Sequence, residues 1–514
     1  MKKYKINFET IKFPLIILLL AVLLRGLSNT ILSEPVINFI SENYSWVLTI
    51  SSITKSFSEL VIKYLPLLII IKILSKKHSS DRVVLMFIIS YFLFLTITMV
   101  LGDSGMPAIV YDELFGMSTS VSQSIIGNGS TILRPYRMGF IGAIIVAYVA
   151  DLSFKITRSR TRYGLLPYID KDVLALITTI LLTLIAGVVF TFIWPLFIGF
   201  LFKVFNWIAN DITNPVSTFV YGFFDRVLSL AGISEINRAT FWNTSLGGSW
   251  MSEVGGNFVG DIPIWNEQIK AGIFNSGFGR FVTPYYIINL FAIPGIAIGI
   301  YSSFTNKRER ISNFSLLVFI IIISVFTDLS LPVEIFLLMM TPLLYGFHIF
   351  VVSSLFAILQ GLKIFIGIPM QESVASASLG SGIDLFSYFK IIELRQNIIV
   401  IIVIGLIIGF IYFAMTKLYY SYFSLGLINK LDIDVLVEEF LEVVGGIDNI
   451  EKIDSSPLRI DVQLKRPQLF NYEKLEDSSI SRVIETKTSY ALYYGTPSTI
   501  MRKEILHLKE ISEV

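Results

Sequence analysis

A few charged side chains stand inside long apolar stretches of this sequence, where a charge is costly unless it is paired or faces water. Glu334 is the clearest example and Asp328 is similar, and Arg226 and Glu235 are further charged candidates. Guanidinium groups donate hydrogen bonds and carboxylates accept them, so these residues are candidates for a functional site. Two structural alternatives stay open. Glu334 could pair with an arginine, and Arg226 could anchor a helix end at a membrane interface.

The composition excludes several kinds of chemistry. The chain has no cysteine, so disulfides, thiolate metal sites, iron–sulfur clusters and cysteine nucleophiles are excluded. It has only three histidines, His78, His348 and His507, so few ligands are available for a histidine-based metal centre. We expect no cofactor. A core histidine is the simpler interpretation of His348, with a proton relay as the alternative. The net charge of +2 is too balanced to suggest nucleic-acid binding.

The elements that must position these residues are membrane helices. Of the 514 residues, 54% are hydrophobic and only 16% are charged, and the mean hydropathy is +0.70. We therefore expect a polytopic α-helical membrane protein with about ten spanning or re-entrant helices. The candidate spans are Phe13–Leu32, Leu60–Leu74, Val83–Leu101, Gly139–Phe154, Val173–Val204, Tyr285–Phe304, Phe314–Val325, Glu334–Leu359 and Ile398–Leu418.

Basic residues between these spans predict the orientation. They form four groups, which the positive-inside rule places in the cytoplasm. These groups are Lys2, Lys3 and Lys5; Lys76, Lys77 and Arg82; Lys155, Arg158, Arg160 and Arg162; and Lys307, Arg308 and Arg310. The amino terminus is then cytoplasmic, and Gly102–Ile132 is an outside loop. The first span lacks a small-residue cleavage site, so we expect it to be retained. Arg25, within that span, is either a solute ligand or a side chain that snorkels or pairs with a carboxylate.

The carboxy-terminal part reads as a soluble domain. From Lys430 onward it carries 16 acidic and 11 basic residues, and long apolar runs are absent. Asp434–Val444 has helical apolar spacing and ends at Gly445–Gly446, a favourable helix end. Leu458–Leu464 and Val483–Tyr493 alternate like strands. These patterns predict a small α/β domain after the membrane body.

Several segments together resemble a known family, the membrane component (enzyme IIC) of the glucose/maltose branch of the bacterial phosphotransferase system (PTS). The segments are "YLPLLIII" (Tyr64–Ile71), "ISYFLFLTITM" (Ile89–Met99), "MGFIGAIIVAYVADLSFK" (Met138–Lys155), "VYGFFDRVLSLAGISEINRATFW" (Val220–Trp242) and "FTDLSLPVEIFLLMMTPLLYGFHIF" (Phe326–Phe350). The resemblance implies a transport domain over residues 1–425, a sugar-like solute and a homodimer in the bacterial cytoplasmic membrane.

The tail extends the resemblance. "VEEFLEVVGGIDNIEKIDSSPLRIDVQL" (Val437–Leu464) is similar to the opening of the fused enzyme IIB domain, so residues 426–514 are expected to be a cytoplasmic IIB-like domain. In the family, a cysteine of this domain takes a phosphoryl group from an enzyme IIA protein and passes it to the sugar. Ser456 falls at that position. A serine hydroxyl is a poor nucleophile without a base, so we expect autonomous phosphorylation to be lost.

The resemblance also implies which residues surround the sugar, and this sequence departs from the family pattern at several of them. The family's two consecutive histidines fall at Ser234 and Glu235. The glutamate before the motif proline falls at Leu331, and the second motif glutamate is kept as Glu334. The predicted substrate-binding residues are Arg226, Ser234, Glu235, Asp328, Glu334, Gly380 and Gly382.

Two functions follow from these observations. The first is a PTS-type permease that moves a hexose or a glucoside by alternating access, with an enzyme IIA or IIB protein as a partner. The alternative is a membrane sensor or partner-binding protein that does not transport. Whether the chain is still a phosphotransferase stays open, since the cysteine, the histidine pair and the first motif glutamate are all absent.

Overall fold

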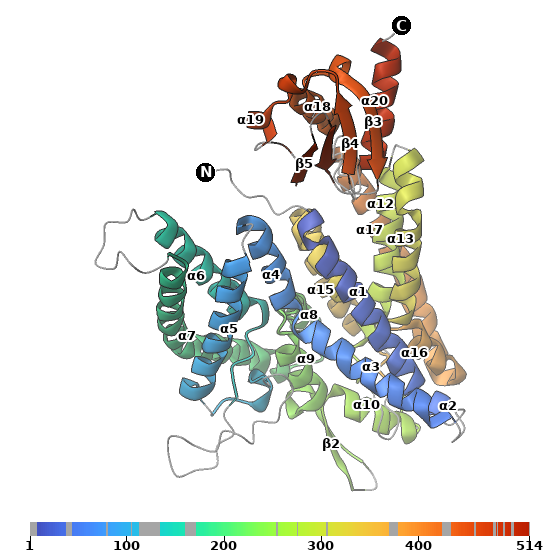
Figure 1. The fold of residues 1–514 in the computed structure, drawn as a ribbon. Coiled ribbons are helices and arrows are strands. Elements are labelled where there is room, and N and C mark those ends of the chain that lie inside the picture. The colour runs from blue at the N-terminus through green and yellow to red at the C-terminus, as the bar shows by residue number, and fades with distance from the viewer. Residues whose placement is uncertain are drawn as a thin grey trace. The chain divides into compact units, whose positions relative to one another are not determined.

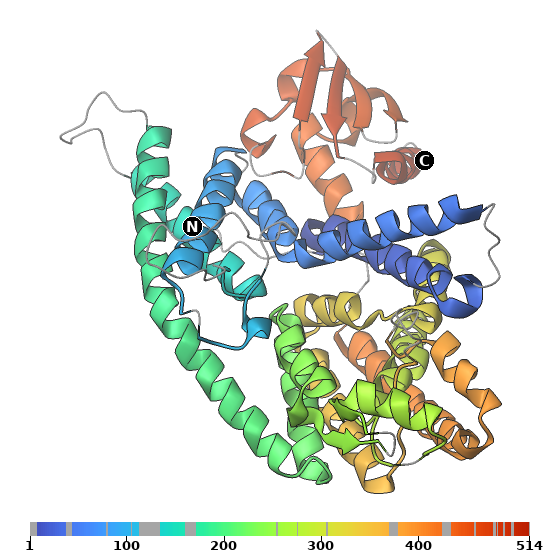
Figure 2. The same cartoon turned by 90° about the horizontal axis from the view of Figure 1, so that it is seen from below.

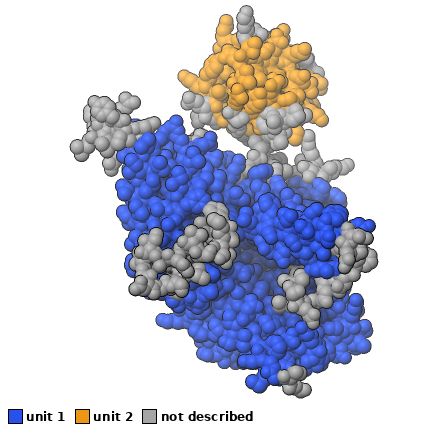
Figure 3. Space-filling view, turned by 60° about the horizontal axis from the view of Figure 1, so that its bottom comes forward, with its two compact units in different colours: residues 1–423 blue, residues 424–514 orange. Residues whose placement is uncertain are grey.

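The computed structural model of the chain describes residues 8–37, 44–78, 81–103, 105–112, 134–159, 171–252, 255–274, 276–304, 307–369, 379–423, 433–456, 459–475, 478, 480, 482–486, 489–494 and 498–512. The predicted cytoplasmic residues Lys2, Lys3, Lys5, Arg160 and Arg162 lie outside these ranges, as does most of the predicted outside loop. The chain divides into two compact units, Met1–Phe423 and Ser424–Val514, which Figure 3 colours blue and orange.

The first unit is helical, and among the described residues seven of its helical stretches are long and apolar enough to cross a bilayer. They are Phe13–Ile31, Asp81–Leu101, Gly139–Thr157, Lys171–Asn210, Thr283–Ser303, Pro342–Leu362 and Ile392–Ser421. Two shorter apolar helices are Asn313–Phe326 and Ser330–Met340. These findings confirm the prediction of a polytopic helical membrane protein.

Most helices of this unit are labelled in Figure 1. In chain order they are α1 (Phe8–Ile31), α2 (Glu34–Ile37), α3 (Ser45–Lys63), α4 (Leu65–His78), α5 (Asp81–Leu101), α6 (Gly139–Ser159), α7 (Lys171–Asn210), α8 (Pro215–Leu230), α9 (Ser234–Asn243), α10 (Asp261–Lys270), α11 (Thr283–Ile287), α12 (Ile293–Ser303), α13 (Lys307–Phe326), α14 (Ser330–Met340), α15 (Pro342–Leu362), α16 (Gly382–Ser387) and α17 (Arg395–Phe423). A short hairpin of β1 (Ser249–Met251) and β2 (Asn257–Val259) precedes α10.

Two predicted spans are interrupted in the structure. The span expected over Leu60–Leu74 is broken at Tyr64, where α3 ends and α4 begins. Pro66 follows directly, and it lacks the N–H that would continue the helical hydrogen bonds. The span expected over Glu334–Leu359 is broken at Thr341, whose backbone angles are φ −144° and ψ 67°. Pro342 then occupies the first position of α15, which suits a proline. As a result α14 is a separate short helix that carries Glu334.

The longest helix, α7, has 40 residues. At 1.5 Å per residue it is about 60 Å long, roughly twice the thickness of the hydrocarbon core. In Figure 2 it runs as one curved helix along an edge of the unit. It packs against α5 and α6 and also against α8. It therefore connects two parts of the membrane body.

Two neighbouring residues determine where α8 begins. Asn214 accepts a hydrogen bond from the backbone N–H of Val216 at 2.8 Å, and Pro215 takes the first helical position. Gly232, with φ +72°, provides the turn after α8, and α9 begins at Ser234. Because α8 packs closely against α15, the charged residues near its end are held inside the helical body.

The second unit is a four-stranded antiparallel sheet with the order β3-β4-β6-β5, accompanied by helices. Its elements are α18 (Ile433–Val444), β3 (Ile450–Ser456), β4 (Arg459–Leu464), α19 (Tyr472–Leu475), β5 (Arg482–Thr486), β6 (Ser489–Tyr493) and α20 (Ser498–Ser512). Apolar side chains of α18, α20 and the strands share one core, which confirms the predicted α/β domain. The single strand expected over Val483–Tyr493 is instead the hairpin of β5 and β6.

Candidate functional site

A cavity of about 450 Å³ lies among the helices of the first unit. Residues of α1, α3, α4, α5, α6, α8, α9 and α14 line it, together with the segments before α6 and α14. Its polar lining residues are Arg25, Glu59, Lys63, Tyr64, Tyr91, Asp112, Tyr136, Arg137, Ser229, Ser234, Glu235, Arg238, Asp328 and Ser330. This set contains four cationic and four acidic side chains. The cavity therefore offers both donors and acceptors without a large excess of either charge.

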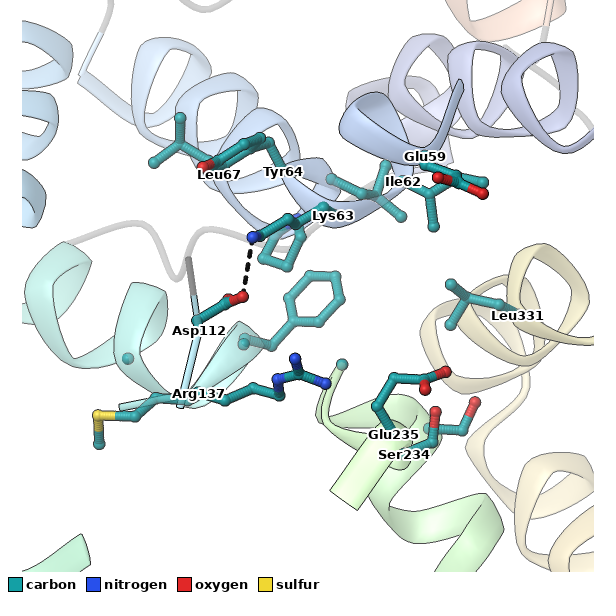
Figure 4. A pocket seen from close by; sticks show the side chains of 18 of the residues that line it. Glu59, Ile62, Lys63, Tyr64, Leu67, Asp112, Arg137, Ser234, Glu235 and Leu331 are labelled. Atoms are coloured by element: carbon teal, nitrogen blue, oxygen red, sulfur yellow. Dashed lines mark ion pairs between the residues drawn. The ribbon is translucent and has the colours of Figure 1, made fainter. Parts of the chain in front are cut away.

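One side of the cavity is closed by an ion pair. Lys63, the last residue of α3, lies with its Nζ 2.8 Å from Oδ1 of Asp112. Their side chains are 32% and 30% exposed. Figure 4 shows this contact, with Arg137 reaching into the middle of the cavity from below it. The Nε atom of Arg137 is buried and has no hydrogen-bond partner in the described part of the chain.

Tyr136 connects the cavity wall to α7. Its hydroxyl accepts a hydrogen bond from the backbone N–H of Asp103 at 2.6 Å. The same hydroxyl donates to the carbonyl oxygen of Thr191, inside α7, at 3.5 Å. Tyr136 is 1% exposed, so this link is buried although the residue also lines the cavity.

The opposite wall is formed by α9 and α14. Ser234 and Glu235 lie there on the same side of the cavity as Leu331 (Figure 4). Glu235 is exposed to this space. Arg238, one turn later on α9, is 9% exposed. Its Nε donates to Asp225 at 2.8 Å, while its Nη2 is buried without a partner among the described residues.

Behind this wall lies a buried ionic network. Arg226 donates to Asp225 and to Glu334, and its Nη2 lies 3.0 Å from the hydroxyl of Tyr285. That hydroxyl donates to Asp225 at 2.5 Å. The Asp225, Arg226, Glu334 and Tyr285 side chains are all 0% exposed. Charges this deeply buried are tolerated only when paired and hydrogen-bonded, so the network fixes α8, α11 and α14 to one another.

The network continues to α15 and α17. His348 Nε2 lies 3.5 Å from Oε1 of Glu334, and His348 Nδ1 lies 2.8 Å from the hydroxyl of Tyr412. Tyr345 donates to the carbonyl oxygen of Arg226 at 3.1 Å. His348 is 1% exposed and Tyr412 is fully buried. The polar cluster therefore extends from the cavity wall to the far side of the bundle.

The structure separates the predicted site residues into three groups. Ser234, Glu235 and Asp328 line the cavity together. Arg226 and Glu334 lie behind its wall and pair with one another, which is the ion-pair arrangement left open by the sequence. Asp328 is 8% exposed, and its Oδ1 accepts from the backbone N–H of Ser330 at 3.0 Å. It therefore also binds the backbone of the first residue of α14.

Gly380 and Gly382 do not line the cavity. Gly380 has φ +67°, and a Cβ built there would lie 2.5 Å from the carbonyl carbon of Tyr285. Only glycine fits such a position without strain. Gly382 begins α16, where Ser381 caps the helix by accepting from the N–H of Asp384. Gly380 therefore lies directly against Tyr285, a residue of the ionic network.

Ser456 lies in the second unit, at the end of β3. It is half-buried and stands opposite Arg459 across the β3–β4 ladder. The side chain of Arg459 is engaged with Asp461 and with the hydroxyl of Tyr493. Among the described residues, no group of three or more histidine, aspartate or glutamate side chains could hold a metal ion.

Some lining residues were missed by sequence reasoning. Lys63, Asp112 and Arg137 carry no motif, and their meeting depends on how α3 and the segment before α6 fold together. Arg25 stands out in the sequence as a charge within the first predicted span, and in the structure it lines the cavity. A charge inside an apolar run was the signal that found it.

Comparisons with known proteins agree with this architecture. Residues 9–353 match the family model described as "Phosphotransferase system, EIIC". The chain is also similar to the PTS system glucoside-specific EIICBA component of Staphylococcus carnosus (strain TM300). The two are 23% identical over 520 residues, an alignment that covers 98% of this chain and 72% of the relative.

Proposed function

The chain belongs to the EIIC family of the phosphotransferase system, and from this premise we propose that it carries a hexose or a glucoside across the cytoplasmic membrane by alternating access. Family membership and the seven span-length helices of the described part of the chain make it a multi-pass sugar-transporter component. Transporters of this kind hold their solute between helices near the bilayer midplane and expose it to each side in turn. The glucoside in the proposal follows the name of the relative from Staphylococcus carnosus.

The observation that carries this proposal is the polar cavity of about 450 Å³ among the membrane helices. Its balanced set of four cations and four carboxylates suits an uncharged solute with many hydroxyl groups, which donate and accept equally. We assign direct contact with the sugar to Ser234, Glu235 and Asp328. Arg226 and Glu334 belong to the same binding site but act from behind its wall in this conformation.

We further propose that the chain cannot phosphorylate its sugar alone. It contains no cysteine, and the residue at the position of the family's phosphorylated cysteine is Ser456. A thiolate is nucleophilic near neutral pH, whereas a serine hydroxyl needs an adjacent base. Transport is then facilitated, or the phosphoryl group comes from the IIB domain of another chain.

The remaining assignments concern location and partners. Residues 1–425 form the transport domain in the lipid bilayer, and residues 426–514 form a degenerate IIB-like domain. Both termini are cytoplasmic, in keeping with the basic groups between the spans. The tail serves as a docking surface for an enzyme IIA or IIB protein, and the transporter is a homodimer.

Uptake into proteoliposomes tests the main proposal. The purified full chain is reconstituted and given a panel of radiolabelled hexoses and glucosides, with and without a phosphoenolpyruvate-driven donor system. We expect donor-independent equilibration of at least one sugar. Strict donor dependence with a phosphorylated product would instead show that the phosphoryl relay works. Glu267→Gln is a matched control because Glu267 pairs with Lys270 on α10, away from the cavity.

A non-transporting sensor is the second candidate, and the altered site favours it. Leu331, Ser234 and Glu235 stand where the resemblance places a glutamate and two histidines, and all three line one cavity. A sensor would bind sugar in the same cavity without moving it. Saturable binding in detergent with no flux in proteoliposomes would support the sensor and exclude the permease.

A further inference from the structure

Arg137 lines the cavity from the segment before α6 and has no part in the function proposed above. Its guanidinium group forms no ion pair or hydrogen bond with the described residues, and its Nε atom is buried. Buried donors are nearly always satisfied in proteins, and a charge inside a membrane body is costly unless it is paired or faces water. The guanidinium group therefore points to a ligand that accepts hydrogen bonds.

The backbone around Arg137 gives this side chain a fixed base. Tyr136 pairs with Tyr111 in an isolated antiparallel bridge, and the N–H of Arg137 donates to the carbonyl oxygen of Val110 at 2.8 Å. Tyr136 and Met138 are only 1% and 3% exposed, whereas Arg137 is half-buried. The guanidinium group thus extends into the cavity from a segment that is held on both sides (Figure 4).

The other cationic residues of the cavity are engaged differently. Lys63 and Arg238 each pair with an aspartate. Arg238 keeps one buried nitrogen without a partner among the described residues, but its charge is balanced by that aspartate. Arg25 has no buried nitrogen that lacks a partner in the described part of the chain. Arg137 is therefore the cation that combines an unbalanced charge with an unsatisfied buried donor.

Glu235 supplies the complementary group on the α9 wall. Its side chain is exposed to the cavity and forms no ion pair or hydrogen bond with the described residues. Figure 4 shows that Arg137 and Glu235 belong to different walls of the cavity. A hydroxyl group can accept a hydrogen bond from a guanidinium group and donate one to a carboxylate. A solute with several hydroxyls would therefore satisfy both side chains, whereas Glu235 would repel an anionic solute.

We propose that Arg137 is a specificity-determining residue of the sugar site, in which its guanidinium group donates to two adjacent hydroxyl oxygens while Glu235 accepts from another hydroxyl. The guanidinium group carries five N–H donors in a planar fork, so it can bind two neighbouring oxygens at once. This inference rests on the proposed transport function, because it requires that a sugar enters the cavity.

Sugars that lack one hydroxyl test the assignment. The probes are the monodeoxy forms of glucose, of methyl glucoside and of any other panel sugar that is taken up, and equilibrium binding is measured on the full chain in nanodiscs. In the wild type, loss of either of two adjacent hydroxyls should weaken binding roughly tenfold to a hundredfold, as expected for hydrogen bonds to a charged group. In Arg137→Gln the parent sugar should bind more weakly by a similar factor. The two analogues should then bind within about twofold of the parent, because their missing hydroxyls no longer have a partner.

Two further variants sharpen this comparison. Arg137→Lys keeps the positive charge but loses the fork, so affinity should depend on at most one of the two adjacent hydroxyls. Arg134→Gln is the matched control, since Arg134 belongs to the same segment but does not line the cavity, and it should keep the wild-type pattern. Thermal unfolding verifies that each variant is folded. If Arg137→Gln does not fold, the lysine variant decides the question by the same comparison.

The possible failures are distinguishable. If folded Arg137 variants show the same relative affinities for all analogues as the wild type, this inference is overturned and the transport proposal stands. A uronate that binds the wild type more tightly than its parent hexose, with the preference lost in Arg137→Gln, would assign Arg137 to an anionic solute and also overturn the inference. If no hexose or glucoside binds at all, the transport proposal and this inference fail together.

Discussion

Arg226 and Glu334 are separated by 108 residues in the sequence and form an ion pair between α8 and α14 in which neither side chain is exposed. Asp225 and Tyr285 complete the coordination of the guanidinium group. The pair lies directly behind the α9–α14 wall of the cavity. It therefore connects the stability of the helical body to the shape of the binding site.

Removing either partner of this pair should be strongly destabilising. Arg226→Ala leaves Glu334 as a buried, uncompensated charge, and loss of one partner of a buried pair costs about 3–5 kcal/mol. Glu334→Gln should cost less, because the amide keeps one acceptor for Arg226. We expect both variants to lose sugar binding. Thermal unfolding in detergent and equilibrium binding would measure the two effects separately.

A double variant separates stability from binding. Arg226→Met combined with Glu334→Leu removes both charges, and apolar replacement of a whole buried pair is often neutral or stabilising. Asp225 keeps Arg238 as its partner. The double variant should therefore recover stability relative to Arg226→Ala without recovering binding. Recovered binding would show that the pair has only a structural role.

The Lys63–Asp112 pair should control access to the cavity more than stability. Both side chains are about a third exposed, and pairs with such exposure contribute roughly 0–1 kcal/mol. Lys63→Ala and Asp112→Asn should therefore unfold near the wild-type temperature but exchange sugar faster. The exchanged pair, Lys63→Asp with Asp112→Lys, should restore the slower rate in stopped-flow measurements. If it does not, the ion pair is not the barrier.

Glu235 should contribute directly to sugar affinity. A hydrogen bond to a charged group contributes about 1.5–3 kcal/mol, so Glu235→Gln should weaken binding roughly tenfold to a hundredfold. The variant should fold normally because the side chain is exposed to the cavity. Glu267→Gln is the matched control on α10. Equal affinities for the two variants would exclude Glu235 from the sugar site.

Ser456 should be dispensable for sugar uptake. Ser456→Ala removes only a half-buried hydroxyl at the end of β3, so the sheet should remain intact. We expect unchanged sugar uptake, and no transfer of ³²P from phosphoenolpyruvate to either the wild type or the variant in the presence of the donor proteins. Labelling that is present in the wild type and absent in Ser456→Ala would contradict the loss of phosphorylation.

Gly380→Ala should be destabilising for steric reasons. The residue has φ +67°, and its new Cβ would lie 2.5 Å from the backbone of Tyr285. Strained backbone positions cost of the order of 1–3 kcal/mol. Gly199→Ala is the opposite case, since nothing lies within 4 Å of its Cβ position in α7. That variant should be neutral or stabilised by up to about 1 kcal/mol, and thermal unfolding would compare the two.

Much of the fold follows from the sequence because membrane helices depend on composition. The apolar runs located the spans, and Pro66 and Pro342 lie just beside the positions where two of those spans break. The sequence allows broken helices but does not predict where they break, since membrane helices often continue through proline when neighbouring groups satisfy the freed carbonyl. In the second unit, alternation alone could not show that Val483–Tyr493 turns back on itself at its middle.

The site was predicted less completely. The cost of a buried charge pointed to Glu334 and indicated that it could pair with an arginine. Which charged residues pair with one another depends on the tertiary structure. Neither the Lys63–Asp112 contact nor the position of Arg137 could therefore be predicted from the sequence. Gly380 was expected at the sugar site from the family resemblance, whereas the structure shows a backbone position with positive φ close to Tyr285.

Pro195 lies within α7, and without an N–H it cannot bond to the carbonyl oxygen of Thr191 in the preceding turn. Tyr136 donates to that same oxygen. Tyr136 therefore supplies a hydrogen bond to the carbonyl oxygen that Pro195 leaves free, so the proline site of the longest helix and the cavity wall meet at one buried side chain.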